Sequence, residues 1–168
     1  MRITILLLVA FSLPVHAQSR NERKEAKQQQ RIIAFNEVKA IIDSASYIFT
    51  ARRAYPQGGR SVDLTTNKNL LIIRNDSATA DLSYFGRAYN IAYSMNAGGI
   101  KFDGTMNSYN LSENNKKLAL IINFKVSTSN DSFDCTLEVF SRSSANLSVL
   151  SQNRSHISYD GYIESYKK

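Results

Sequence analysis

The fold is decided by residues 118–126, Leu118-Ala119-Leu120-Ile121-Ile122-Asn123-Phe124-Lys125-Val126. Large apolar side chains occupy every second position of this stretch, and Asn123 and Lys125 fall between them. An alternation with period two is typical of a β-strand with one face against a core. We therefore predict a half-buried strand in which Leu120, Ile122 and Phe124 face inward.

Similar short apolar stretches recur along the chain, separated by turn formers. They cover residues 47–53, 69–74, 79–85, 89–95, 100–106, 133–139, 147–149 and 157–163. Between them lie turns such as Pro56-Gln57-Gly58-Gly59, Asn75-Asp76-Ser77 and Ser129-Asn130-Asp131. Eight or nine strands at roughly eight- to twelve-residue spacing, without alternating helices, indicate an all-β antiparallel barrel or sandwich.

One helical segment precedes the strands, over about residues 24–44. Its apolar residues recur at spacings of three and four, which predicts one amphipathic helix that packs on a sheet or plugs its end. They are Ala34, Phe35, Val38, Ile41, Ile42 and Ala45. Residues 18–31 are almost wholly polar, and we expect a tether or a frayed helix start there.

The N-terminus has the three parts of a secretory signal peptide in residues 1–17. Arg2 is followed by the apolar residues 3–13 and by Val15-His16-Ala17, a small–x–small cleavage pattern. We expect cleavage after Ala17 and export to the periplasm or the cell exterior. Gln18, rather than a cysteine, follows that site, which favours a soluble product without a lipid anchor. The remaining chain has no second apolar run of membrane-spanning length, and residues 32–168 are long enough for a single helix-plus-barrel domain.

Composition argues against several functional classes. The one cysteine, Cys135, provides no disulfide framework, and His156 is the one histidine beyond the signal peptide, so we predict no metal site and no cofactor. These two residues fall on different strand faces, which disfavours a nucleophile–base pair, and we do not expect an enzyme. The net charge of +7 is dispersed, so we expect no nucleic-acid partner.

Candidate ligand-binding residues follow from strand parity. Arg53 shares its predicted face with Tyr47, Phe49 and Tyr55. A guanidinium there would hold an anionic head group at the mouth of a barrel lumen. The alternative is that Arg53 stacks on Tyr55 or lies on the outer face.

Further aromatic residues fit either a cavity or a packed core. Tyr89, Tyr93 and Phe102 would line the same lumen, or simply fill it. Two segments, Tyr84-Phe85-Gly86-Arg87 and Tyr159-Asp160-Gly161-Tyr162, suit a sugar- or peptide-binding surface because they combine tyrosine with glycine or arginine. The alternative for both segments is turn and edge structure.

Four segments in this order resemble the bacterial family called domain of unknown function 4251. They are Ala51-Arg52-Arg53-Ala54-Tyr55-Pro56, Leu82-Ser83-Tyr84-Phe85-Gly86-Arg87-Ala88-Tyr89, Gly98-Gly99-Ile100-Lys101-Phe102-Asp103-Gly104 and Ile157-Ser158-Tyr159-Asp160-Gly161-Tyr162-Ile163. The resemblance covers about residues 24–164. It implies a small lipocalin-like, calycin-like barrel and a secreted or envelope location in Gram-negative gut bacteria, and it implies no mechanism. One departure is Ser83, where the family pattern leads us to expect proline.

These features predict a non-catalytic secreted or periplasmic envelope protein that holds a small apolar or amphipathic, lipid-like ligand in its barrel. The alternative is a surface-interaction module that binds a glycan or another envelope protein through exposed tyrosines. The two hypotheses differ in what they require of the barrel: a carrier needs an open lumen, whereas an interaction module needs a filled barrel and exposed aromatic residues.

Overall fold

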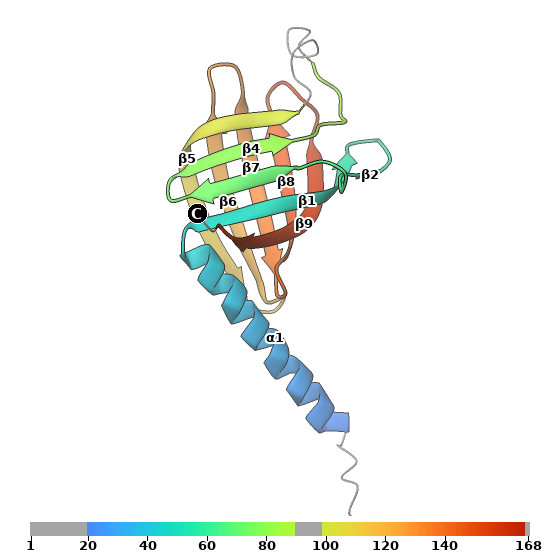
Figure 1. Ribbon diagram of the computed structural model, residues 1–168, viewed down its shortest axis with the longest axis vertical. Coiled ribbons are helices and arrows are strands. Elements are labelled where there is room, and N and C mark those ends of the chain that lie inside the picture. The colour runs from blue at the N-terminus through green and yellow to red at the C-terminus, as the bar shows by residue number, and fades with distance from the viewer. Residues whose placement is uncertain (1–19, 90–98, 167–168) are drawn as a thin grey trace, which may run out of the picture.

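The computed structural model describes residues 20–89 and 99–166, which form a closed antiparallel β-barrel preceded by one helix (Figure 1). The elements are α1 (Arg20–Asp43), β1 (Ser46–Pro56), β2 (Val62–Asp63), β3 (Leu70–Arg74), β4 (Ser77–Leu82), β5 (Ile100–Asn114), β6 (Ala119–Ser127), β7 (Ser132–Phe140), β8 (Ser144–Ser151) and β9 (Ile157–Ser165). The all-β barrel of about eight strands with an N-terminal helix is thus confirmed.

The barrel closes because β1 pairs on both sides. Its first half pairs with β3, almost its whole length pairs with β9, and the strands between follow in chain order from β3 to β9. Closure leaves the eight main strands without a long exposed edge. The short strand β2 adds to the last part of β1, through Arg53 and Ala54. With only two residues, β2 is too short to show an alternating pattern in the sequence.

The barrel interior is filled with side chains. Leu120 and Ile122 have no exposed surface and Phe124 is 2% exposed, so the predicted inward face of β6 is confirmed. Other inward residues without exposed surface are Tyr47, Phe49, Leu71, Leu82, Leu137, Leu147 and Tyr159. A side chain that bordered a water-sized void would expose surface to it, so these positions border no such void. They form one continuous apolar cluster with the buried face of α1.

A β-bulge in β1 overturns the predicted face of Arg53 and Tyr55. The register with β9 shifts between Ala51 and Arg53, and Ala54 becomes the inward residue, with no exposed surface. A bulge adds one residue to a strand, so every later side chain moves to the opposite face. Arg53 and Tyr55 therefore lie on the outer wall rather than beside Tyr47 and Phe49.

Glycine on the neighbouring strand permits this bulge. Gly161 pairs with Ala51, and a Cβ atom at position 161 would collide with the carbonyl oxygen of Thr50. The backbone of β1 can therefore approach β9 this closely only where β9 has no side chain. The Tyr159-Asp160-Gly161-Tyr162 segment is thus strand structure at the bulge.

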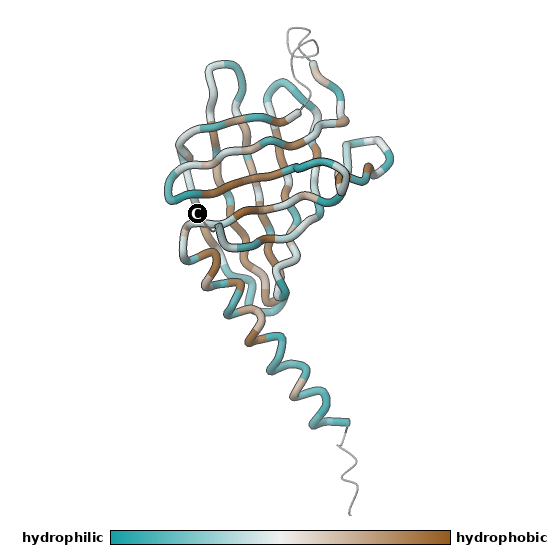
Figure 2. Tube along the Cα trace, in the orientation of Figure 1, coloured by the Kyte–Doolittle hydropathy of each residue, from teal (hydrophilic) through white to brown (hydrophobic). Residues whose placement is uncertain are grey.

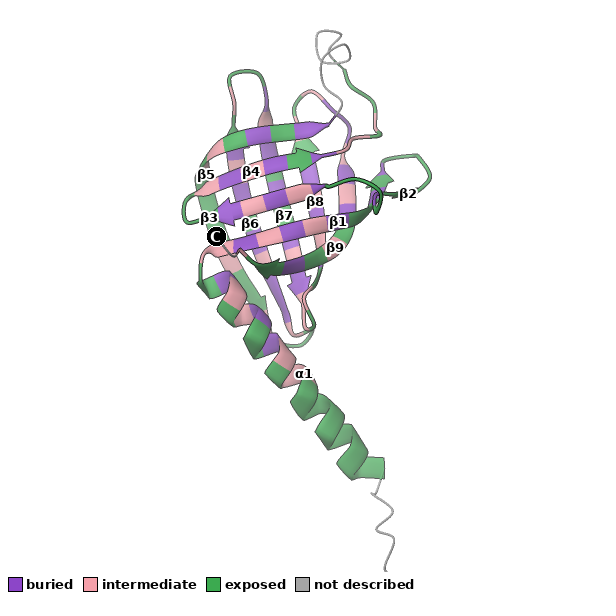
Figure 3. Ribbon diagram, viewed as in Figure 1, coloured by how far each residue is buried: buried purple, intermediate pink, exposed green. Residues whose placement is uncertain are grey.

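Helix α1 closes one end of the barrel, which we call the helix end (Figures 1 and 3). Its C-terminal half buries Phe35, Val38 and Ile42, and Lys39 forms an ion pair with Glu113 at the end of β5. The helix begins at Arg20 rather than near residue 24. Residues 20–31 are therefore helical, not a tether, and they project beyond the barrel as exposed polar helix (Figures 2 and 3).

The opposite end of the barrel, which we call the distal end, is formed by the last residues of β1, β4, β6 and β8. Asp131 organises one of its loops: the buried carboxylate accepts hydrogen bonds from Ser132 N at 2.8 Å and from Ser151 Oγ at 2.7 Å. These bonds join the β6–β7 turn to the end of β8. No helix among the described residues is both long and apolar enough to cross a bilayer.

Candidate functional site

The predicted ligand-binding residues do not gather in one place. Arg53 is half exposed on the outer wall, where its Nη2 lies 3.9 Å from Asp63 Oδ2. Tyr55 is also on this wall, and its pKa is raised chiefly by a hydrogen bond with the Asp160 side chain. Asp160 also accepts a hydrogen bond from Asn146 Nδ2 at 2.8 Å. This group is therefore a polar network on the outer wall, away from the interior.

The remaining predicted residues have separate environments. Phe102 faces the core, 5% exposed, with its ring 5.1 Å from that of Phe133, so its inward orientation is confirmed. Tyr89 is 68% exposed, so the prediction that it lines the lumen is wrong. Tyr93 lies outside the described residues.

A short segment, residues 83–89, crosses the distal end of the barrel, and we call it the strap. Tyr159 Oη reaches out of the core and donates a hydrogen bond to Ser83 O at 2.9 Å. Ser83 N donates to the buried Asn69 Oδ1 at 2.6 Å. A proline at position 83 would have no N–H to donate. Ser83, where the family pattern leads us to expect proline, therefore makes a hydrogen bond to Asn69 that a proline could not make.

The middle of the strap is fixed to the β8–β9 loop. Tyr84 Oη lies 2.8 Å from Ser155 Oγ, and Ser155 Oγ also accepts a hydrogen bond from Arg87 N at 3.0 Å. The backbones pair in addition, because Ser155 N donates to Arg87 O and Tyr89 N donates to Asn153 O, both at 2.9 Å. With these bonds, the strap is held as part of the barrel rather than as a free loop.

A buried arginine lies beneath the strap. Arg154 is 5% exposed, its Nη1 donates to Gly99 O at 2.6 Å, and its guanidinium carbon lies 5.2 Å from the centre of the Tyr84 ring. A cation over an aromatic face stabilises both partners, and more strongly when water is excluded. Arg154 therefore helps to hold the Tyr84 ring in its inward position.

Gly86 lets Tyr84 and Ser155 meet. A Cβ atom at position 86 would lie 2.5 Å from Ser155 Oγ and would collide with the Tyr84 hydroxyl. Tyr84 thus points inward while the neighbouring Phe85 points outward, 45% exposed. The segment Tyr84-Phe85-Gly86-Arg87 was open to two interpretations, a binding surface or turn structure. Tyr84 has the structural role, because it holds the segment to the barrel, and Phe85 remains available to a ligand.

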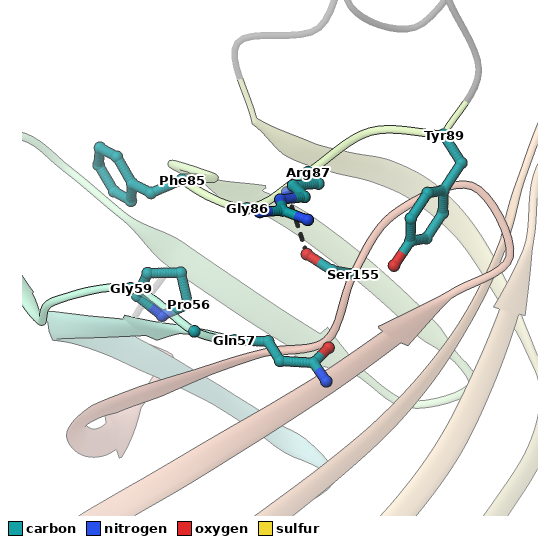
Figure 4. Close-up of a pocket in the computed structure, with 9 residues that line it drawn as sticks. Pro56, Gln57, Gly59, Phe85, Gly86, Arg87, Tyr89 and Ser155 are labelled. Carbon is teal, nitrogen blue, oxygen red and sulfur yellow. Dashed lines mark hydrogen bonds between the residues drawn. The ribbon is translucent and has the colours of Figure 1, made fainter.

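Between the strap and the β1–β2 turn lies a cleft of about 470 Å³, open to solvent, which we call the distal cleft (Figure 4). It is lined by Pro56, Gln57, Gly58, Gly59, Phe85, Gly86, Arg87, Tyr89 and Ser155. Phe85 lies near Pro56 and Gly59 at one end, and Tyr89 lies on the far side of Arg87 and Ser155 (Figure 4). The cleft thus has an aromatic ring toward each end and polar groups between them.

The described lining residues combine aromatic, polar and basic groups. They supply aromatic faces, an arginine, a glutamine amide and bare glycine backbone, and they include no carboxylate, thiol or imidazole. Elsewhere, burial raises the pKa of the Cys135 thiol, and His156 Nε2 lies 2.8 Å from Ser148 Oγ. Within the described residues, no three His, Cys, Asp or Glu side chains are placed to hold a metal ion.

The sequence indicates only part of this cleft. Phe85, Gly86 and Arg87 belong to the segment that combines tyrosine with glycine and arginine, and Tyr89 is a predicted ligand-binding residue, whereas Ser155 has no distinguishing pattern. The turn at residues 56–59 was visible as a turn, but its position beside the strap depends on barrel closure.

Comparison with known proteins places the chain in a family. A family model described as "Domain of unknown function (DUF4251)" matches residues 27–163. The fold is similar to the crystal structure of a DUF4251 family protein from Bacteroides eggerthii, with a TM-score of 0.61, 17% sequence identity, and coverage of 82% of this chain and 91% of that chain. A comparison with curated proteins gave no match. The family match extends from Lys27 in α1 to Ile163 in β9, and the chain therefore belongs to the DUF4251 family.

Proposed function

We propose that this chain is a non-catalytic protein of the cell envelope, periplasmic or secreted, and that its distal cleft binds a glycan. One observation carries the proposal: two exposed aromatic side chains, Phe85 and Tyr89, are held toward the two ends of a partly polar cleft. The signal-peptide pattern of residues 1–17 supports the envelope location.

The surface is favoured over the interior as the ligand site. Inward residues such as Tyr47, Leu137 and Leu147 have no exposed surface, which leaves no room for a lipid chain beside them. Arg53, the residue expected to anchor such a ligand, points away from the interior. The surface-interaction hypothesis therefore replaces the luminal carrier as the leading one.

A glycan matches the cleft better than a protein surface does. Sugar rings have apolar faces that stack on aromatic side chains and hydroxyl groups that hydrogen-bond to planar polar groups, which here are Gln57 and Arg87. The cleft volume is in the range of small-ligand sites, whereas protein interfaces are broad and bury larger areas. The strap is also fixed to the barrel, which reduces the entropic cost of binding.

A glycan array probed with the exported chain tests this proposal. We expect binding to one class of oligosaccharide, with Phe85→Ala and Tyr89→Ala each weakening it about tenfold or more, as loss of a stacking contact would. Tyr162→Ala is the matched control, because Tyr162 is 37% exposed on β9 and does not line the cleft. Isothermal titration calorimetry with the best oligosaccharide would give the affinities.

Two results would overturn the glycan proposal. The first is an affinity that Tyr162→Ala lowers as much as Phe85→Ala does. The second is an array without binding, together with capture of an envelope protein that depends on Phe85 and Tyr89. That second result would establish the cleft as a protein-docking surface instead.

A further inference from the structure

A row of cations runs along the projecting half of α1. Arg20, Lys24, Lys27 and Arg31 follow one another at spacings of four, three and four, and Arg23 lies beside them. At 100° per residue the five side chains fall within an arc of about 100° of the helix surface. We call these five residues the basic stripe.

The basic stripe continues the face with which α1 packs on the barrel. The same spacing leads from Arg31 to Phe35, Val38 and Ile42, the three buried residues of the helix. Arg31 is half-buried where the barrel begins, and the stripe residues before it are exposed. One helix face is therefore apolar under the barrel and basic beyond it. Figures 2 and 3 show the projecting half of the helix as hydrophilic and exposed.

The acidic residues of this half lie elsewhere on the helix. Glu22 and Glu25 fall on the side opposite to the stripe by the same helical geometry. None of the five cations forms an ion pair with another residue of the described chain. Like charges four residues apart, such as Arg20 and Lys24, destabilise a helix slightly. An anion bound along the stripe would remove that repulsion.

Further cations lie at the same end of the molecule. Lys116 in the β5–β6 turn and Arg142 in the β7–β8 turn are both exposed at the helix end of the barrel. The projecting helix and these turns therefore present positive charge together, whereas the distal cleft lies at the opposite end of the barrel (Figure 1).

We propose that the basic stripe binds a linear acidic polysaccharide that lies along residues 20–31. The stripe extends for about 16 Å at 1.5 Å per residue, which suits a chain carrying a negative charge on each successive sugar. Repeated cations on one face are complementary to such a polyanion, and a second copy of the same stripe would be repelled. This inference is independent of the function proposed for the distal cleft.

A flexible chain fits the geometry better than a membrane surface. Because the stripe continues the face of α1 that packs on the barrel, a flat bilayer laid along this face would meet the barrel. Residues 20–31 contain no large apolar side chain that could insert between lipids, as interfacial helices usually have.

The test uses the exported chain and a heparin octasaccharide as a linear acidic probe. The triple variant R20Q/K24Q/K27Q removes exposed cations and keeps good helix formers. We expect about tenfold or greater loss of affinity, a smaller dependence of affinity on salt, and a rise in wild-type helicity on binding, seen by circular dichroism. The matched control R52Q/K68Q/K101Q removes three exposed cations outside α1 and should keep the wild-type affinity.

The second arm of the test measures binding to vesicles of phosphatidylcholine in which about 30% of the lipid is anionic phosphatidylglycerol. Stripe-dependent binding to vesicles but not to heparin would overturn the proposal in favour of a membrane. An equal loss of heparin affinity in both triple variants would also overturn it, since net charge would then explain the binding. Absence of heparin binding by the wild-type chain at low salt would have the same consequence.

Discussion

The hydroxyl group of Tyr84 lies 2.8 Å from Ser155 Oγ, although 71 residues separate the two positions in the sequence. This contact joins the strap to the β8–β9 loop and sets the outward position of Phe85 and Arg87. The shape of the distal cleft therefore depends on the Tyr84–Ser155 hydrogen bond, although the Tyr84 ring does not line the cleft.

A double-mutant cycle on this pair should show coupling. Tyr84→Phe and Ser155→Ala should each destabilise the protein by about 1–2 kcal/mol. Tyr84→Phe removes the hydroxyl that lies within hydrogen-bond distance of Ser155 Oγ and Arg87 O, and Ser155→Ala leaves Arg87 N without its acceptor. The double variant should cost less than the sum of the two changes. Urea unfolding followed by circular dichroism measures all three variants. Strict additivity would show that the contact contributes nothing.

Replacement of Gly86 by alanine should be costly. The added Cβ would collide with the Tyr84 hydroxyl and lie 2.5 Å from Ser155 Oγ, so the strap must shift. We expect a loss of about 2 kcal/mol or more. Gly104→Ala is the matched control, because its Cβ would meet Val126 Cγ1 at an ordinary 3.7 Å. Equal stability of the two variants in thermal or urea unfolding would contradict the close packing described for the strap.

The sequence predicted the barrel well because its strands repeat a simple period. Leu120, Ile122 and Phe124 face inward as their alternation indicates, and the helix face of Phe35, Val38 and Ile42 follows its own period. These patterns arise from local geometry and burial, which act on neighbouring residues.

The bulge in β1 was not predictable in the same way. It lies between Ala51 and Arg53, where no neighbouring glycine or proline marks it, and the glycine that permits it lies on β9. The strap was also hidden, because Tyr84 and Ser155 meet only once the barrel closes. Parity therefore misplaces Arg53 and Tyr55, which follow the bulge, whereas the composition of residues 84–87 correctly draws attention to Phe85 at the cleft.

Truncation of Phe124 should show how much the packed interior contributes to the free energy of unfolding. Phe124→Ala removes a ring that is 2% exposed and should cost about 3–5 kcal/mol. Leu150→Ala is the control, since Leu150 is 53% exposed on the outer wall and should change stability by less than about 1 kcal/mol. Urea melts compare the two. A cost below that of Leu150→Ala would mean that the register of β6 is wrong.

Cys135 should make the protein sensitive to alkali. Burial raises the pKa of its thiol in the folded state, so the folded protein holds this proton more tightly than the unfolded chain does. The stability linked to the thiol is complete below the unfolded value of 9.0 and falls as the pH rises above it. The slope should grow as the pH passes 9.0 and approach about 1.4 kcal/mol per pH unit above it.

Urea melts from about pH 8 to about pH 10 measure this slope for the wild type and for Cys135→Ala, in which the thiol no longer contributes. The thiol of the folded protein should also react slowly with Ellman's reagent and rapidly in urea, because Cys135 is 3% exposed. A wild-type slope equal to that of the variant, or rapid labelling of the folded protein, would place the thiol at the surface.

Arg53→Ala should leave both stability and ligand binding almost unchanged. The guanidinium lies on the outer wall, 3.9 Å from Asp63, and such exposed ion pairs contribute at most about 1 kcal/mol. Arg53 is not among the described residues that line the distal cleft, so the glycan affinity of Arg53→Ala should match that of the wild type, whereas Phe85→Ala should lose it. Calorimetry with the same oligosaccharide and thermal unfolding measure both quantities. If Arg53→Ala instead released a co-purified fatty acid, detected by mass spectrometry, the outer wall around Arg53 and Tyr55 would be the ligand site and the distal cleft would not.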